Sequence, residues 1–282
     1  MAEPPPKPRA RGFKAVSLSP VPRDLLGGPP RRAGAWTAKV ITLFPQAFPG
    51  VLGLSLTGKA LDAGLWALET LDLRAFGAGR HRNVDDTPAG GGAGMVLRAD
   101  VLGRAIEVAQ AGVPTEGWPL IALSPRGRPF DQAMARRLAA GAGVTLICGR
   151  FEGIDQRVLD HYGIAEVSLG DFVLTGGEIA AQALIDATVR LIPRVLGNQA
   201  STEEESFARG LLEFPQYTKP AVWKGHAIPD ILLSGHHGQI ASWRQAEAER
   251  LTKERRPDLW RAYRDRADAA ARDGDPGGDR EL

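Results

Sequence analysis

The chain has 282 residues, a formal net charge of +2 and 43% hydrophobic residues, which is enough for a buried core in one large or two smaller domains. No apolar run is long enough to span a bilayer, and the basic N-terminus lacks the apolar segment of a secretory signal. The single cysteine, Cys148, excludes an internal disulfide and a multi-cysteine metal site. We therefore expect a cytoplasmic protein with no membrane contact.

The two ends of the chain differ in composition from its body. Residues 1–36 are rich in proline and arginine and are predicted to be a disordered extension, and residues 273–282 are predicted to be a disordered tail. Basic segments on either side of a mildly acidic body are compatible with a polyanionic partner. Charge alone still favours the simpler interpretation, a solvated surface.

Residues 37–195 alternate between apolar strand patterns and helical patterns. Strands are expected near residues 39–44, 66–73, 120–123, 144–148 and 164–169. Helices are expected over residues 48–63, 100–110, 130–140 and 178–192, with Asp100 as a cap of the second. This alternation predicts an α/β domain with a mostly parallel sheet. The glycines at 90–94 do not have the spacing of a dinucleotide-binding loop.

Two glycine-rich turns, at residues 149–153 and 170–177, each follow a predicted strand. Ligands of open α/β sheets bind beyond the carboxyl ends of the strands, and glycine lets the backbone approach them closely. We therefore expect a small-molecule site built from these two turns. Thr175 and Glu178 have the spacing of a helix capping box, which favours a structural role for Glu178. Cys148 lies in an apolar run and is predicted to be a buried hydrophobic residue.

The C-terminal part is predicted to be a separate helical unit. Residues 196–212 are rich in helix and strand breakers and are expected to be a linker. Residues 213–272 contain a predicted turn at 231–238 and two predicted helices, at 239–254 and 257–271, in which Trp, Tyr and Arg interleave. This pattern is compatible with nucleic-acid binding, and equally with core aromatics beside solvated arginines.

One ordered set of motifs points to a known family. The motifs lie at residues 43–45, 80–86, 90–95, 123–125, 148–155, 168–174, 176–178, 195–197 and 232–236. Together they resemble the bacterial tRNA (guanine-N1)-methyltransferases of the SPOUT class, the TrmD type, over residues 37–265. The resemblance implies a trefoil-knotted, mostly parallel sheet domain followed by a small, mainly helical domain that binds tRNA. It also implies a homodimer with active sites at the subunit interface, S-adenosylmethionine as methyl donor, and methylation of N1 of the guanosine at position 37 of tRNA.

The resemblance also implies which residues form the donor site. These are Leu123, Ser124, Pro125, Gly127, Gly149, Phe151, Glu152, Gly153, Ser168, Leu169, Gly170, Asp171, Phe172, Val173, Leu174, Gly176 and Gly177. Phe151 and Phe172 stand where related enzymes often have tyrosine, so stacking remains without the hydroxyl. Glu152 is a candidate contact for Mg²⁺, which the family is thought to use, although one carboxylate is a weak metal signature.

Two catalytic residues follow from the same resemblance. Arg190 matches the arginine that stabilises charge on guanine O6, and Glu205 stands where the family has an aspartate that removes the N1 proton. Glu204 is the alternative base if the loop shifts by one residue. Thr202 and Glu205 also have capping-box spacing. The alternative functions are another SPOUT methyltransferase, acting on a ribosomal RNA base or a ribose 2′-OH, and a non-catalytic RNA-binding protein with this fold.

Overall fold

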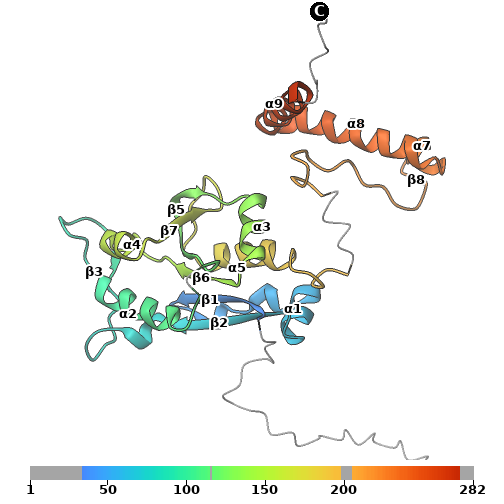
Figure 1. Cartoon of the computed structure of the whole chain (residues 1–282). Coiled ribbons are helices and arrows are strands. Elements are labelled where there is room, and N and C mark those ends of the chain that lie inside the picture. Colours follow the sequence, from blue (N-terminus) through green and yellow to red (C-terminus); the bar gives the residue numbers. More distant parts are fainter. Residues whose placement is uncertain (1–33, 115, 198–204, 274–282) are drawn as a thin grey trace, which may run out of the picture.

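The computed structural model describes residues 34–114, 116–197 and 205–273. They form an α/β unit followed by a smaller helical unit (Figure 1). Residues 1–33 and 274–282, predicted to be disordered, and residues 198–204 of the predicted linker lie outside the described residues, so those predictions stay untested.

A five-stranded parallel sheet with strand order β2-β1-β6-β5-β7 forms the centre of the α/β unit (Figure 1). Its strands are β1 (Trp36–Thr42), β2 (Trp66–Asp72), β5 (Leu120–Pro129), β6 (Gly143–Cys148) and β7 (Ala165–Ser168). Two antiparallel pairs complete the strands of the described chain: β3 (Asp85–Asp86) with β4 (Val96–Leu97), and β8 (Val222–Trp223) with β9 (His226–Ala227). The predicted α/β class with a mostly parallel sheet is confirmed.

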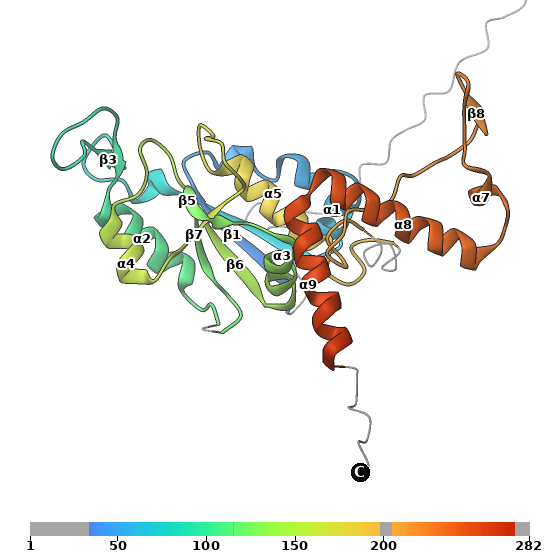
Figure 2. The same ribbon diagram turned by 90° about the horizontal axis from the view of Figure 1, so that it is seen from above.

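Helices cover both faces of the sheet, as Figures 1 and 2 show. The helices α1 (Ser55–Asp62), α3 (Gln132–Ala140) and α5 (Glu178–Val189) share one core with Ala38, Val40 and Leu146. The helices α2 (Ala99–Gln110) and α4 (Gln156–Tyr162) share the other core with Ile41 and Ile147. Because the central strands are buried on both faces, their sequences are continuous apolar runs, and all six residues of β6 are buried.

Three short 3-10 helices join these elements: η1 (Pro45–Ala47), η2 (Gly50–Gly53) and η3 (Leu73–Phe76). The first two correct the prediction of one helix over residues 48–63. Pro49 has no amide hydrogen to donate, and glycines at 50 and 53 weaken a helix, so the α-helix begins only at Ser55.

Two further boundaries differ from the prediction. Strand β5 continues past residue 123 to Pro129, because after a register shift Arg128 and Pro129 pair with Val167 and Ser168 of β7. Asp100 does not cap α2. It lies in the first turn, where its charge suits the helix dipole, and Arg98 takes the capping position without a side-chain hydrogen bond.

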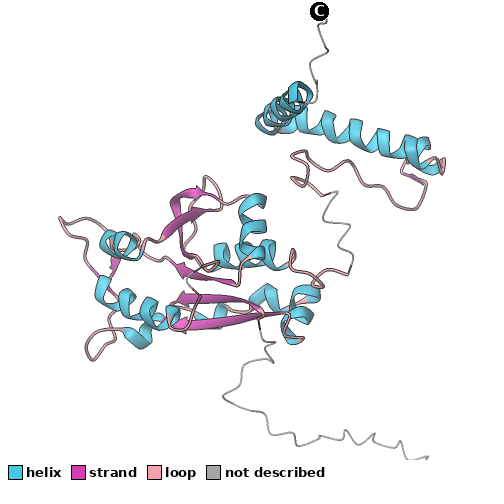
Figure 3. Cartoon of the chain, viewed as in Figure 1, coloured by secondary structure: helices cyan, strands magenta, loops and turns pink. Residues whose placement is uncertain are grey.

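The C-terminal unit is mainly helical (Figure 3). Its helices are α7 (Asp230–Leu233), α8 (His237–Arg255) and α9 (Pro257–Asp273). The region 231–238, predicted to be a turn, therefore contains most of one short helix and the start of α8. Leu211, Ala248, Leu251 and Thr252 are buried in this unit, and the Thr252 hydroxyl accepts a hydrogen bond from the Leu212 amide at 2.8 Å. Within the described residues, no helix combines the length and the apolar character that crossing a membrane requires.

Leu184 of α5 is completely buried and provides a test of the packing between α5 and the sheet. Leu184→Ala is expected to lower the free energy of unfolding by about 2–5 kcal/mol, because it removes apolar contacts and leaves a cavity. Urea unfolding followed by circular dichroism measures this change. Val108→Ala, at a position on α2 that is 55% exposed, is the control and should change stability by about 0.5 kcal/mol or less.

Candidate functional site

A pocket of about 350 Å³ lies at the carboxyl ends of β5, β6 and β7. This volume is in the range of small-molecule sites, about 300–1,000 Å³. Most of its walls come from residues 149–154, which we call the first pocket loop, and residues 169–177, the second pocket loop. We call this cavity the strand-end pocket. It lies at the two glycine-rich turns where the sequence predicts a small-molecule site.

The strand-end pocket contains most of the residues that the sequence assigns to the donor site. Its walls include Leu123, Ser124, Pro125, Gly149, Phe151, Glu152, Gly153, Ser168, Leu169, Phe172, Val173, Leu174, Gly176 and Gly177. Gly127, Gly170 and Asp171 are not part of the walls. Gly127 instead packs against β7, where a Cβ atom would come within 2.3 Å of the Val167 amide nitrogen.

Seven further residues line this pocket that the sequence did not assign to it individually. They are Arg126, Arg150, Ile154, Glu166, Val167, Thr175 and Ala180. Arg150 and Thr175 lie within the two turns predicted to form the site, whereas the other five lie outside them. Glu166 is on β7 and forms an ion pair with Arg126 at 3.0 Å, a contact across two strands that no local pattern indicates.

Glu178 has a different role from the one predicted. The N-cap of α5 is Gly177, which makes no side-chain cap, so the predicted capping box is wrong. The Glu178 side chain is buried, and its Oε1 atom accepts a hydrogen bond from the Thr42 hydroxyl at 2.7 Å. Its Oε2 atom lies 2.8 Å from Nη2 of Arg150. The Glu178 carboxylate thus binds the Thr42 hydroxyl and the partly buried Arg150 guanidinium instead of capping the helix.

The two pocket loops touch directly through their backbones. The Gly177 amide donates a hydrogen bond to the Gly149 carbonyl at 2.9 Å. A Cβ atom at position 177 would lie 2.7 Å from the Cα atom of Cys148, so only glycine permits this approach. Cys148 is buried as predicted, and burial raises the pKa of its thiol well above the ordinary value, which leaves it unreactive at neutral pH.

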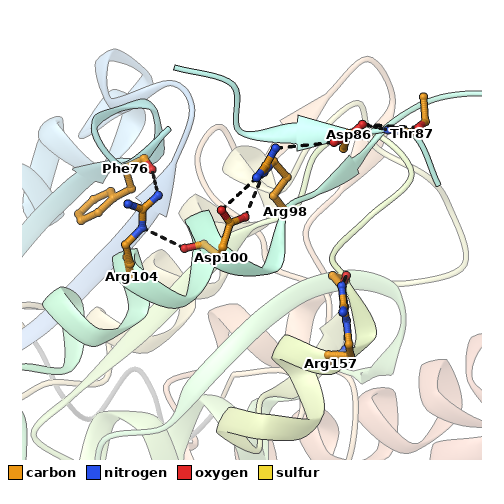
Figure 4. A network of polar contacts seen from close by, with 8 residues as sticks. Phe76, Asp86, Thr87, Arg98, Asp100, Arg104 and Arg157 are labelled. Carbon is orange, nitrogen blue, oxygen red and sulfur yellow. Dashed lines mark hydrogen bonds and ion pairs between the residues drawn. The ribbon is translucent and has the colours of Figure 1, made fainter. Parts of the chain in front are cut away.

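A third segment, residues 83–98, is fixed to the first pocket loop. The Glu152 amide donates to the Met95 carbonyl at 2.9 Å, and the Leu97 amide donates to the Gly153 carbonyl at 3.0 Å. Figure 4 shows the polar contacts that hold this segment on its other side. Arg98 forms ion pairs with Asp100 at 3.0 Å and with Asp86 at 3.6 Å. The glycine-rich segment 88–95 therefore ends beside the strand-end pocket, where Met95 is bonded to Glu152.

The two predicted catalytic side chains meet each other. Nη1 and Nη2 of Arg190 donate to Oε2 and Oε1 of Glu205, each at 2.6 Å, in a bidentate contact (carboxylate and guanidinium groups facing in parallel). Arg190 is the C-cap residue of α5, and Glu205 lies in the predicted linker. The hydrogen bonds from Arg190 hold the pKa of Glu205 below its ordinary value, so the carboxylate is ionised at neutral pH.

Neither of these side chains lines the strand-end pocket. Glu205 instead lines a smaller cavity of about 130 Å³ beside α8, together with Arg209, Phe214 and Arg244. Within one chain, the structure therefore brings Glu205 and Arg190 together but does not bring them to the predicted donor residues. Thr202 and Glu204 lie outside the described residues, so the second capping box and the alternative base stay untested.

The surroundings of Glu152 do not fit a Mg²⁺ site formed by the protein alone. Mg²⁺ prefers octahedral oxygen ligands, commonly one or two carboxylates with phosphates and waters. The other carboxylate in the pocket wall, Glu166, is already paired with Arg126. No group of three potential metal-ligating side chains occurs in the part of the chain that the structure describes. We derive no step of the reaction through a metal ion.

Comparisons with known proteins identify the family. The sequence model of the family described as tRNA (guanine-1)-methyltransferase TrmD matches residues 37–262. The chain belongs to this family.

Curated relatives of the family extend over most of the chain. A tRNA (guanine-N(1)-)-methyltransferase of Cereibacter sphaeroides (strain KD131) is 73% identical over 251 residues, which cover 88% of this chain and 99% of the relative. Proteins of the same name from Ruegeria sp. (strain TM1040) and Nitrobacter winogradskyi are 73% and 62% identical. These matches cover 84% and 80% of this chain and 97% and 94% of the relatives.

The Arg190–Glu205 pair should make stability depend on pH in a defined direction. Because the folded pKa of Glu205 is lowered, its stabilising contribution is complete above the unfolded pKa, about 4.3, and is lost as pH falls through the folded value. Glu205→Gln should therefore lower the free energy of unfolding by about 1 kcal/mol at pH 7. Urea unfolding from pH 7 downward should show this difference shrinking only in the acid range.

Glu254→Gln is the matched control for this pH series. Glu254 is an exposed carboxylate on α8 that pairs with Arg250, so its replacement should have little effect at any pH. A difference between wild type and Glu205→Gln that stays constant through the acid range would show that the ion pair does not contribute as described.

Proposed function

We propose that this member of the tRNA (guanine-N1)-methyltransferase family binds S-adenosylmethionine in the strand-end pocket and methylates N1 of the guanosine at position 37 of tRNA. The observation that carries the proposal is the pocket itself, which forms where two glycine-containing loops meet beyond three parallel strands. Apolar side chains such as Leu169 and Leu174 and the ring of Phe172 suit a flat adenine. When bound, S-adenosylmethionine supplies an electrophilic methyl group.

The residues of this chain have to make guanine N1 a nucleophile. N1 carries a proton at neutral pH, and a carboxylate within hydrogen-bond reach can remove it as the methyl group is transferred. We assign that role to Glu205. Negative charge then develops on guanine O6, and the guanidinium of Arg190 can stabilise it. The two groups belong together because the same base presents N1 and O6 side by side.

The Arg190–Glu205 contact supports this assignment. It also defines which interaction the guanine of the tRNA substrate has to replace when it binds. Arg190 keeps Glu205 in its ionised form, which is the form that a general base needs. The same contact occupies both carboxylate oxygens, each held at 2.6 Å. Guanine has to replace part of this contact, with N1–H taking one carboxylate oxygen and O6 taking one guanidinium nitrogen. This exchange keeps both charged groups paired throughout.

We propose further that the active enzyme is a homodimer. Large apolar side chains in and after the second pocket loop are exposed, including Val173 at 82% and Ile179 at 62%. Val51 of the 3-10 helix η2, which contacts α5, and Leu54, which follows η2, are each 65% exposed. Several large exposed apolar side chains on neighbouring elements are typical of a protein interface. A second subunit on this surface could bring its own linker carboxylate to the strand-end pocket, which lacks one in the single chain.

Two finer features of the proposal come from the family. We propose that the sheet domain is a trefoil knot, in which the chain after β7 passes through an earlier loop before α5, and the contact of Gly177 with Gly149 is consistent with such a crossing. We also propose that the helical unit holds the tRNA. Trp223 is 60% exposed, and Lys224 lies over its ring at 5.0 Å, which provides a stacking surface beside a positive charge.

Glu205→Gln tests the catalytic assignment, because the amide keeps the shape of the side chain but cannot accept the N1 proton. We expect S-adenosylmethionine affinity to stay unchanged in calorimetric titration, and the single-turnover rate of methyl transfer to tRNA to fall by about 10²- to 10⁴-fold. The tRNA substrate carries guanosine at position 37, and a transcript with adenosine there should accept no methyl group. Mass mapping of the product separates N1 methylation from ribose methylation.

Glu204→Gln is the matched control for this experiment and should retain wild-type turnover. If Glu204→Gln loses turnover and Glu205→Gln retains it, the base is Glu204 and our assignment is wrong.

Trp223→Ala tests the role of the helical unit. Loss of one stacking surface should weaken tRNA binding by about 5- to 150-fold, which corresponds to 1–3 kcal/mol. S-adenosylmethionine affinity should not change. Filter binding with labelled tRNA measures the first effect and calorimetry the second, with Val108→Ala on the opposite unit as the control. Unchanged tRNA affinity would remove Trp223 from the proposed binding surface.

A further inference from the structure

A buried ion pair connects the two pocket loops from behind. Arg150 belongs to the first pocket loop, and Glu178 begins the helix that follows the second. Nη2 of Arg150 lies 2.8 Å from Oε2 of Glu178, and only 24% and 5% of the two side chains are exposed. The sequence motifs assign no individual role to Arg150, and they predict only a helix-capping role for Glu178.

Arg150 contacts more than its carboxylate partner. Its Nη1 atom donates a hydrogen bond to the Thr175 carbonyl, at 3.1 Å, in the second pocket loop. Its guanidinium lies over the ring of Phe44, with Cζ 4.4 Å from the ring centroid. A Cβ atom at position 176 would come within 2.1 Å of Nε, so the side chain packs directly on the Gly176 backbone. One arginine therefore spans from one wall of the pocket to the other.

Glu178 is in turn fixed to the end of strand β1. Its Oε1 atom accepts the hydrogen bond from Thr42, which is completely buried, and the Thr42 hydroxyl also accepts from the Phe44 amide at 2.9 Å. The ion pair thus connects the end of a central strand to both pocket loops. The ion pair has a rigid strand on one side and two glycine-rich loops on the other. This is the arrangement expected of contacts that hold loops in position.

The pair is not arranged for maximal stability. Arg150 Nε and Glu178 Oε2 are buried without a hydrogen-bond partner among the described residues, although the two side chains are in ionic contact. Buried polar atoms without partners are costly and uncommon in native structures. A well-packed apolar pair would avoid that cost. Its presence directly behind a ligand pocket indicates that the position of the arginine matters more than the stability it provides.

We propose that Arg150 and Glu178 are positioning residues, which hold the two pocket loops at the separation that donor binding requires. The inference rests on the proposed binding of S-adenosylmethionine in the strand-end pocket. Arg150 transmits the position of the buried carboxylate to the second pocket loop through its hydrogen bond to Thr175. The pair acts on donor affinity and takes no part in moving the N1 proton.

The test separates positioning from folding by comparing one single variant with a double variant. Arg150→Met removes the cation and leaves the Glu178 carboxylate buried without compensation, so both thermal stability and donor affinity should fall. The double variant Arg150→Met/Glu178→Gln leaves no buried charge, and the glutamine amide can still accept from Thr42. Its melting temperature should therefore recover above that of Arg150→Met. The double variant still lacks the hydrogen bond from Arg150 to the Thr175 carbonyl.

The double variant is expected to recover stability without recovering donor affinity. Calorimetric titration with S-adenosylmethionine should give a dissociation constant about 10- to 100-fold above wild type, the effect of a misplacement of about 1 Å. In steady-state assays, KM for S-adenosylmethionine should rise by a similar factor, while kcat at saturating donor and tRNA changes much less. Arg157→Met, at an exposed arginine whose side chain is 83% exposed, is the matched control and should bind the donor as wild type does.

Each remaining outcome contradicts the inference in a distinct way. A double variant with wild-type donor affinity would show that the pair serves folding alone. A fall in kcat with unchanged KM would place the pair in the chemical step instead. Failure of the wild-type protein to bind S-adenosylmethionine would overturn the donor pocket and the proposed function together, and this is visible before any variant is compared.

Discussion

The site depends on the close approach of two loops beyond the ends of neighbouring strands. The Gly149 carbonyl and the Gly177 amide join them at 2.9 Å, and the buried pair of Arg150 and Glu178 lies behind that contact. Without side chains at 176 and 177, the second loop can lie directly on the first and on the arginine. The strand-end pocket is the space that remains in front of this junction.

The sheet provides the rigid base that such a junction needs. The parallel strands are buried on both faces, so α1, α3 and α5 on one side and α2 and α4 on the other fix the ends of β5, β6 and β7 relative to one another. Charged groups are few in this interior. Among the described ion pairs, Arg150 with Glu178 and Arg126 with Glu166 reach the pocket wall, and the first pair is the more buried. Apolar packing thus fixes the strand ends from which the loops begin, and polar contacts fix the position of the loops relative to each other.

The proposed chemistry places the base and its charge partner on a different part of the chain. Arg190 ends α5, and Glu205 begins the segment that leads to the helical unit, so the contact between them joins the two units of the molecule. Binding of a guanine between these groups would replace part of their ion pair with hydrogen bonds to N1–H and O6 of the base. This division separates donor binding, which needs rigid loops, from substrate binding, which needs a carboxylate that can change partners.

The sequence by itself determined the five strands of the sheet and the helices α2, α3 and α5, since apolar runs and helical periodicity are local patterns. It placed the start of α1 too early and did not predict α4. It also indicated most of the pocket wall, because glycines after strands such as Gly149 and Gly177 have a local physical reason. Only the tertiary structure decided the role of Glu178, which local spacing assigned to a helix cap. Its partners Thr42 and Arg150 lie 136 and 28 residues away. Charge pairing depends on distance in space, and spacing along the chain carries no information about it.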